Sequence, residues 1–349
     1  MITIMTLLLT AMLLLLIPSF QTYMVGKLSN WLTTQTGHQV SIEAVQIKWF
    51  DQAVINGIAV FDQNENIMVR MDEMMVDFDL RNLAGDSKFV DQVVLYDGEI
   101  RVRKYSDSTS VNITVFLDSL KALVTPKERR SVFHIQDVRA EQLEFSFDHM
   151  ARDSLEGLFD YNHFELVDIK LNLGSFNLVR DTVEFKINSL SAEDRATDLR
   201  IQSLTSLFRI CQKSLSLGQL KLETPHSIVR DSLMLSFDRL QNLSYINDSV
   251  TIYANLTRTT LHAQDLGLFS TFFQKFNEPY DFSGVLSGKV KDLNMKDFSI
   301  VYGNSSRISG DAYFRGLPDL PSTYIEAAVN RSYFDSEDLL KFIPVNAHD

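Results

Sequence analysis

Alternation of apolar and polar residues with a period of two recurs along most of this chain. In the segments Leu143 to Asp148 and Val183 to Ile187, every second residue is apolar and the residues between are polar or charged. Successive side chains of a strand point to opposite faces of a sheet, so each segment predicts a strand with one apolar face. Turns rich in Asp, Asn, Ser and Gly separate such segments, which predicts a mainly β, mostly antiparallel chain.

Three architectures accommodate this pattern. Two sheets packed face to face would bury the apolar faces against each other, and a barrel would close the sheet on itself. An elongated stack of strands would leave a long apolar trough. The chain has only 14 glycines and 7 prolines in 349 residues, fewer than the turns of a sandwich or barrel of this size normally carry. The strand pattern alone does not choose among the three.

Helical spacing of apolar residues occurs in only a few places. Residues 21–37 predict one helix that ends at Gly37, and residues 112–123 predict a second. Residues 264–276 predict a third helix, with Leu266, Phe269, Phe273 and Phe276 on one face. A last short helix is expected over residues 336–342, capped by Ser336.

The first 20 residues contain no charged side chain. About 20 apolar residues in a helix match the roughly 30 Å hydrocarbon core of a bilayer. A cleaved signal peptide would carry a basic start and an exit site of small residues, whereas no basic residue precedes Lys27 and the exit reads Ile17-Pro18-Ser19-Phe20. We therefore expect an uncleaved transmembrane signal anchor at 1–20, followed by a juxtamembrane helix at 21–37.

Composition argues against several functional classes. The net charge is −12, which repels phosphate backbones, so we expect no nucleic-acid binding. One cysteine excludes an intramolecular disulfide, and none of the seven histidines has metal-ligand spacing. The chain contains no Gly-rich phosphate loop and no Gly-x-Ser-x-Gly motif. We therefore expect no catalytic residue, metal or cofactor, and no enzymatic activity.

Several segments, taken in their order along the chain, are similar to one known family. They are Leu28–Leu32, Thr36–Ile42, Val45–Phe50, Val54–Val60, Met74–Phe78, Val93–Val102, Ala263–Phe269, Phe282–Val290 and Ile308–Asp311. This order resembles the N-terminal region of the AsmA-like and TamB (translocation and assembly module) family, in the form found in the Bacteroidetes. The resemblance covers essentially the whole chain. Family members are usually far longer, so the chain is expected to be an N-terminal part of a larger protein, a truncated gene model or a short relative.

The resemblance implies a fold, a location and a role. The fold would be an elongated, curved, groove-like stack of strands, with a first groove segment at 38–124 and a continuing one at 125–349. The charged stretch 125–131 would mark the seam between them. The chain would hang from the inner membrane by a single pass, with its bulk in the periplasm. Its expected role is to carry phospholipid between the inner and outer membranes during envelope biogenesis. The alternative is an assembly factor that acts with an outer-membrane β-barrel partner and moves no lipid.

Apolar residues on the alternating strands are the candidates for lining such a groove. They are Val76, Phe78, Leu80, Leu143, Phe145, Phe147, Val183, Phe185, Ile187, Leu233, Leu235 and Phe237. The same alternation also builds any ordinary sheet core, so packing in a closed core remains the competing interpretation of each residue. If they line a groove, membrane phospholipids are the expected partners.

Overall fold

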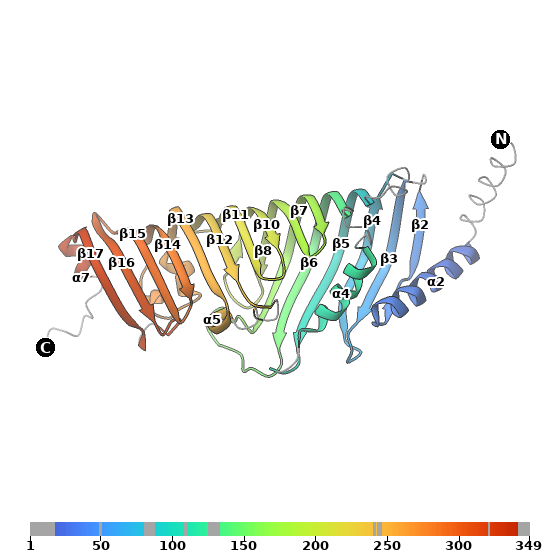
Figure 1. The fold of residues 1–349 in the computed structure, drawn as a ribbon, viewed down its shortest axis with the longest axis horizontal. Coiled ribbons are helices and arrows are strands. Elements are labelled where there is room, and N and C mark those ends of the chain that lie inside the picture. The colour runs from blue at the N-terminus through green and yellow to red at the C-terminus, as the bar shows by residue number, and fades with distance from the viewer. Residues whose placement is uncertain are drawn as a thin grey trace. The chain divides into compact units, whose positions relative to one another are not determined.

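The computed structural model describes residues 18–48, 51–79, 88–107, 110–124, 133–239, 242, 246–319 and 322–340. Within these residues the chain is mainly β, with 17 strands in one open, mixed sheet and few short helices (Figure 1). The predicted fold class is confirmed at this level. Residues 1–17 of the expected anchor, Leu80, the seam at 125–131 and the last two residues of the helix expected at 336–342 lie outside the described residues.

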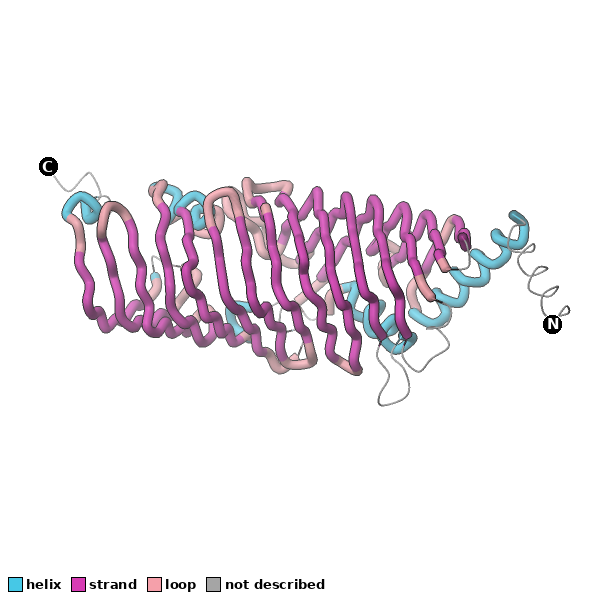
Figure 2. The backbone as a smooth tube through the Cα atoms, turned by 90° about the horizontal axis from the view of Figure 1, so that it is seen from above, coloured by secondary structure: helices cyan, strands magenta, loops and turns pink. Residues whose placement is uncertain are grey.

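The chain divides into two compact units, which are described separately. Unit 1 contains residues 1–154 and 161–180, and unit 2 contains residues 155–160 and 181–349. Figure 2 shows how strands follow one another side by side within each unit.

Among the residues that the structure describes, unit 1 holds seven strands and two helices. They are α2 (Pro18–Thr36), β1 (Val40–Ser41), β2 (Ala44–Lys48), β3 (Gln52–Phe61), β4 (Ile67–Asp77), β5 (Lys88–Lys104), α4 (Asn112–Val124), β6 (Phe133–His149) and β7 (His163–Val179). Both β1 and β2 pair with β3, and pairing continues in chain order from β3 to β7. All these pairs are antiparallel except β5–β6, which is parallel. Because parallel neighbours need a crossover connection, the helix α4 between β5 and β6 is part of what makes this pairing feasible.

Unit 2 holds the remaining strands. They are β8 (Thr182–Asp194), β9 (Arg200–Ile201), β10 (Ser203–Ile210), β11 (Ser214–Glu223), β12 (Ile228–Ser236), β13 (Thr251–His262), β14 (Pro279–Lys289), β15 (Asp292–Tyr302), β16 (Ser306–Arg315) and β17 (Tyr324–Tyr333). The helices among its described residues are α5 (Ile246–Ser249), α6 (Ala263–Gly267), η2 (Phe273–Lys275) and α7 (Ser336–Leu340). Strand β8 pairs with both β9 and β10, and from β10 to β17 each strand pairs antiparallel with the next.

A row of backbone irregularities interrupts the strand ladders in the interior of both units. Residues with positive φ lie at or beside these interruptions: Gly57, Asp97, Gln142 and Asp168 in unit 1, and Gln219, Asp231, Arg258, Gly284, Asp297, Gly310 and Arg331 in unit 2. A β-bulge bends its strand and increases the local twist. The non-glycine residues in this row are all polar, and all but the half-buried Asp231 are exposed. The pairing register is unchanged across Gly57 and Asp97, whereas it shifts beside the other positions. We call all of these positions the bulge row.

Two of the predicted helices are present in nearly the expected places. Helix α2 ends at Thr36, and Gly37 follows with a φ of 70° while its N–H donates to the Thr33 carbonyl at 3.0 Å. Left-handed glycine is the common way to end a helix. Helix α4 covers the segment predicted at 112–123.

The continuous helix predicted at 264–276 is wrong. The chain forms α6 over Ala263–Gly267 and a single 3₁₀ turn, η2, over Phe273–Lys275. Gly267, Ser270 and Thr271 lie at or within the break, and these residue types favour a helix less than Leu or Lys do. The apolar spacing in this segment was therefore not sufficient evidence for an unbroken helix.

The last helix begins where predicted, but Asp335, rather than Ser336, accepts the Glu337 N–H at 2.9 Å. Helix α7 is held by Asp338, whose side chain is fully buried. The Asp338 carboxylate accepts the Ser306 hydroxyl at 2.7 Å and the backbone N–H of Asn304 at 3.0 Å. The residue thereby ties α7 to the turn between β15 and β16.

This attachment predicts a specific pH dependence. The hydrogen bond from Ser306 lowers the pKa of Asp338 from 3.8 to about 2, with further donation from backbone N–H groups. A lowered folded-state pKa means that the stabilisation is fully present above the unfolded value and is lost as pH falls through the folded one. NMR titration of the Asn304 amide should show a midpoint near pH 2, and a midpoint near 3.8 would contradict the assignment.

Candidate functional site

The apolar residues of unit 1 form rows that run from strand to strand. Leu143, Phe145 and Phe147 of β6 lie opposite Ile169, Leu166 and Phe164 of β7. Directly opposed residues on neighbouring strands share one face of a sheet. The Phe164 ring lies 5.9 Å from the rings of both Phe145 and Phe147.

These rows continue from β6 toward the N-terminal strands. On β5, Gly98, Ile100 and Val102 lie opposite the same three residues of β6. The rows through Gly98 and Ile100 continue across β4 and β3, and two further rows begin at Val93 and Leu95 of β5 and continue across β4, β3 and β2. The residues concerned are Val93, Leu95, Val69, Met71, Met74, Val76, Ala53, Ile55, Ile58, Val60, Val45 and Ile47. All these residues together are the unit 1 apolar face.

Helices cover the N-terminal part of the unit 1 apolar face. Leu28 and Leu32 of α2 and Ile113 and Phe116 of α4 pack in the same hydrophobic cluster as strand residues such as Ile55. Asn112 anchors the start of α4, because its side-chain amide donates to the Asp62 carboxylate at 3.1 Å and its carbonyl accepts the Arg103 N–H at 2.9 Å. Burial acts to raise the pKa of Asp62, but hydrogen bonds from Tyr105 and Asn112 outweigh it and hold the pKa below its usual value. The α4 cover is therefore attached through an ionised carboxylate at neutral pH.

Unit 2 repeats the arrangement over more strands. Phe185 of β8 lies opposite Phe208 of β10, with the rings stacked at 4.4 Å and 10°. Phe208 in turn lies opposite Leu217 of β11, which lies opposite Leu233 of β12. A parallel row passes through Val183, Ile210, Leu215, Leu235 and Ile252.

The same rows extend to the last strand of unit 2. Ala254 and Leu286 link β13 to Met295 of β15. Further opposed residues are Gly288, Leu293, Phe314 and Ile325 in one row, Ala312 and Ala327 in the next, and Phe282, Ile300 and Ile308 in a third. Ile187 of β8 lies opposite Ser206 of β10, on the same face as Phe185. We call the residues of these unit 2 rows, together with Ile187, the unit 2 apolar face.

Side chains between the apolar positions are largely polar and lie on the opposite face. Glu184 of β8 lies opposite Arg209 of β10, and their side chains form an ion pair at 2.7 Å. The opposite face is not uniformly polar. Met234 and Tyr253 are about two-fifths exposed there, and Val54 and Val94, which lie between residues of the unit 1 apolar face, are buried. On the apolar faces, Phe145, Phe147, Phe185 and Phe208 remain half-buried. These four aromatic side chains are therefore not sealed in a closed core.

The twelve candidates divide into three groups. Nine lie in strands of the two apolar faces: Val76, Leu143, Phe145, Phe147, Val183, Phe185, Ile187, Leu233 and Leu235. Phe237 follows β12 and is buried, with its N–H bonded to the Lys213 carbonyl at 3.0 Å. Phe78 follows β4, and Leu80 lies outside the described residues.

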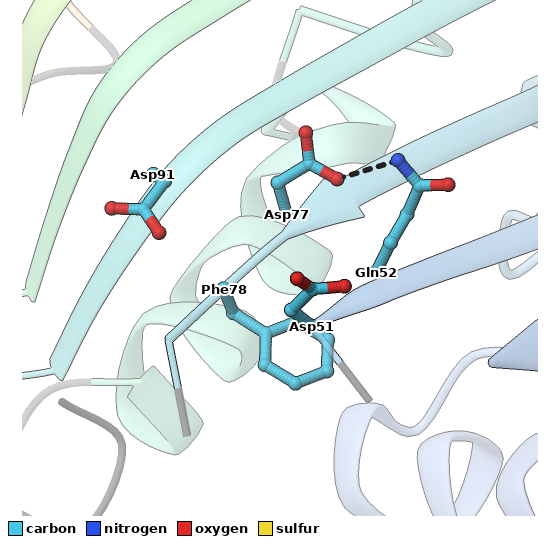
Figure 3. A pocket seen from close by; sticks show the side chains of 5 residues that line it. All are labelled: Asp51, Gln52, Asp77, Phe78 and Asp91. Atoms are coloured by element: carbon cyan, nitrogen blue, oxygen red, sulfur yellow. Dashed lines mark hydrogen bonds between the residues drawn. The ribbon is translucent and has the colours of Figure 1, made fainter. Parts of the chain in front are cut away.

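Phe78 lines a polar pocket of about 310 Å³ with Asp51, Gln52, Asp77 and Asp91 (Figure 3). The Gln52 amide donates to the Asp77 carboxylate at 2.7 Å. In the part of the chain that the structure describes, no group of three or more His, Cys, Asp or Glu side chains is placed to hold a metal ion. The pocket therefore differs in chemistry from the apolar faces and offers no ligand set for a metal.

No family model and no curated protein matches this chain. Among the described helices, none combines the length and the apolar character needed to cross a membrane.

Two features of the site were not predicted from the sequence. The bulge row has a partial local signal, because aspartate and glycine are depleted in ordinary strands and glycine inside a strand often marks a bulge. Its Gln and Arg positions carry no such signal. The exposed aromatic residues of 268–276 were placed on a helix face, whereas the structure places them in a connection between β13 and β14. The low helix propensity of Gly267 and Ser270 was the sequence signal that could have indicated this break in the helix.

Proposed function

We propose that this protein binds phospholipid acyl chains on its two apolar faces and carries phospholipid between the inner and outer membranes in envelope biogenesis. The observation that supports it best is the continuity of the apolar rows, which pass from strand to strand within each unit while their large aromatic side chains stay half-buried. A sheet that needed only a core would be expected to seal these rings.

The physical argument concerns the cost of an acyl chain in water. Each methylene that leaves water gains about 0.8 kcal/mol, so a continuous apolar strip is the minimum that a tail-binding surface needs. Neighbouring strands lie about 4.8 Å apart, and each added strand extends the strip by the same step. Such carriage requires no catalytic group.

The proposed location rests on the sequence. The uncharged run at 1–20 would anchor the chain in the inner membrane by a single pass, leaving the β units in the periplasm. The resemblance to the AsmA-like and TamB family supports the same arrangement and the curved, groove-like form of the sheet. In this proposal the bulge row would supply the curvature, since a bulge bends the strand in which it occurs.

Native mass spectrometry with lipid extraction on the purified full chain tests the proposal. We expect more than one phospholipid per chain to be retained after removal of free detergent micelles. A preparation that is monodisperse, stable and free of bound lipid would contradict the proposal and favour the assembly-factor alternative.

One observation favours that alternative specifically. Strand β17 pairs with β16, and all of its residues except Ser332 are exposed, including Tyr324, Ile325 and Val329. Exposed edge strands can accept an added strand from another protein. An outer-membrane β-barrel partner that engaged β17 would therefore suit an assembly factor that moves no lipid.

A further inference from the structure

Exposed phenylalanines gather in the connection between β13 and β14 of unit 2. Phe269 and Phe272 are 39% and 40% exposed, although phenylalanine is normally buried. The Phe272 ring contacts those of Phe273 and Phe276 at centroid distances of 5.2 and 5.4 Å. We call residues 268–276 the aromatic loop.

The aromatic loop is held in place by specific contacts within unit 2. The Phe159 N–H donates to the Leu268 carbonyl at 2.6 Å, and the Phe159 ring lies 5.6 Å from that of Phe269. The Gln274 amide donates to the Gly267 carbonyl at 3.1 Å. The exposure of Phe269 and Phe272 is therefore maintained by a tethered backbone.

The aromatic loop connects to the sheet by ring contacts. Phe273 meets Tyr280 of β14 edge to face at 6.2 Å, and Tyr280 lies 6.2 Å from its cross-strand partner Tyr302 of β15. Ile300, a residue of the unit 2 apolar face, lies two positions before Tyr302 in β15, so the two side chains share a face. A line of rings thus leads from the exposed Phe272 to that face.

Charge in the aromatic loop contrasts with the rest of the chain. Residues 266–276 contain no acidic residue and one lysine, whereas the whole chain carries a net charge of −12. The Lys275 ammonium lies 4.7 Å from the Phe272 ring centre and 5.1 Å from that of Phe276. A cation beside exposed aromatic rings is the chemistry that suits the headgroup boundary of a bilayer with anionic phosphates.

We propose that the aromatic loop docks on the surface of a lipid bilayer, with Phe269 and Phe272 inserted at the boundary of headgroups and acyl chains and Lys275 facing the phosphates. In this arrangement the rings of Phe273, Tyr280 and Tyr302 lead acyl chains from the bilayer to the unit 2 apolar face. The inference rests on the proposed function, because it gives the entry point of the lipid that unit 2 would carry.

The test reads the local depth of the aromatic loop in the full chain. The only cysteine is replaced (Cys211→Ser), a single cysteine is introduced (Phe272→Cys), and it is labelled with an environment-sensitive fluorophore. The labelled chain is reconstituted into vesicles of phosphatidylethanolamine and phosphatidylglycerol that contain a lipid with a quenching group on its acyl chain. The matched control carries Lys186→Cys in the same background, at an exposed position on the opposite face of β8.

We expect a blue-shifted emission and roughly twofold or greater quenching at position 272, with little change at position 186. Adding Lys275→Glu should weaken the local docking by roughly 25-fold in anionic vesicles, from about fivefold for each unit of charge, while Lys275→Arg should preserve it. Equal quenching at positions 272 and 186, or no response to Lys275→Glu, would overturn the inference. So would protection of the label at position 272 by a second protein chain instead of lipid.

Phospholipid retained by the same preparations is measured separately. Bound lipid without quenching at position 272 removes the docking inference and leaves the proposed function intact. Quenching at position 272 in a chain that retains no phospholipid supports docking and contradicts carriage.

Discussion

Replacing Phe185 with aspartate is expected to abolish phospholipid loading of unit 2 while the chain remains folded. The Phe185 ring is half-buried and stacks on Phe208 at 4.4 Å. A carboxylate at this position would break the acyl-chain strip, and loss of contact with three or four methylenes, roughly 3 kcal/mol, corresponds to about a 100-fold loss of affinity. Lipid retained per chain is measured by native mass spectrometry and lipid extraction.

The fold should survive this substitution at a moderate cost. Losing the stacked pair and part of the buried ring area should lower the free energy of unfolding by about 2–3 kcal/mol. The matched control is Lys186→Asp, which changes the charge on the next residue, exposed on the opposite face, and should change stability by about 0.5 kcal/mol or less. Equal lipid retention by Phe185→Asp and Lys186→Asp, with both chains folded, would exclude the unit 2 apolar face as the lipid site.

The same comparison in unit 1 uses Phe145→Asp and Ser146→Asp. If Phe145→Asp unfolds the chain while Phe185→Asp does not, Phe145 is a core residue and the lipid site is confined to unit 2. For Phe145, that result would decide between the two interpretations that the sequence left open, packing in an ordinary sheet core and lining of a lipid-binding groove.

Much of the sheet could be predicted from the sequence because period-two alternation is a local signal. Leu143, Phe145 and Phe147 mark the second half of β6, and Val183, Phe185 and Ile187 mark β8, as expected. The extent of each strand was harder to predict. One extra residue at a bulge inverts the phase of the alternation, so Val138 and Ala140 before Gln142 are out of phase with Leu143 and Phe145 after it. A single strand of 17 residues therefore reads as two short ones.

Pairing between distant segments could not be predicted by the same means. The parallel pairing of β5 with β6 depends on where α4 lies, and no periodicity within either strand encodes the direction of its neighbour. The sequence predicts the face on which a side chain lies better than it predicts the strand's pairing partner, because a strand's own alternation fixes which of its side chains share a face. For this reason the candidate residues could be assigned to an apolar face before it was known which strands would lie beside them.

Replacing Gly310 with alanine is expected to be the most destabilising single change in the bulge row of unit 2. Gly310 has a φ of 153°, and a Cβ at this position would lie 2.1 Å from the backbone carbonyl oxygen of Ala328 on β17. Residues with a side chain rarely adopt this conformation, and such backbone strain costs on the order of 1–3 kcal/mol. Because the clashing atom belongs to the backbone, relief requires β16 and β17 to separate, so we expect a total loss of about 3–4 kcal/mol.

Gly218→Ala provides a control at the same row of the sheet. Gly218 lies beside the bulge of β11, but its φ is ordinary and an added Cβ would meet nothing closer than 3.8 Å. Since alanine restricts the unfolded chain more than glycine does, this change should be neutral or stabilising by up to about 1 kcal/mol. Urea unfolding of both variants, with hydrogen exchange of the β16 and β17 amides, measures the difference. Similar stability for the two variants would mean that the bulge row tolerates a straightened β16, and the curvature assigned to it in the proposed function would lose its structural basis.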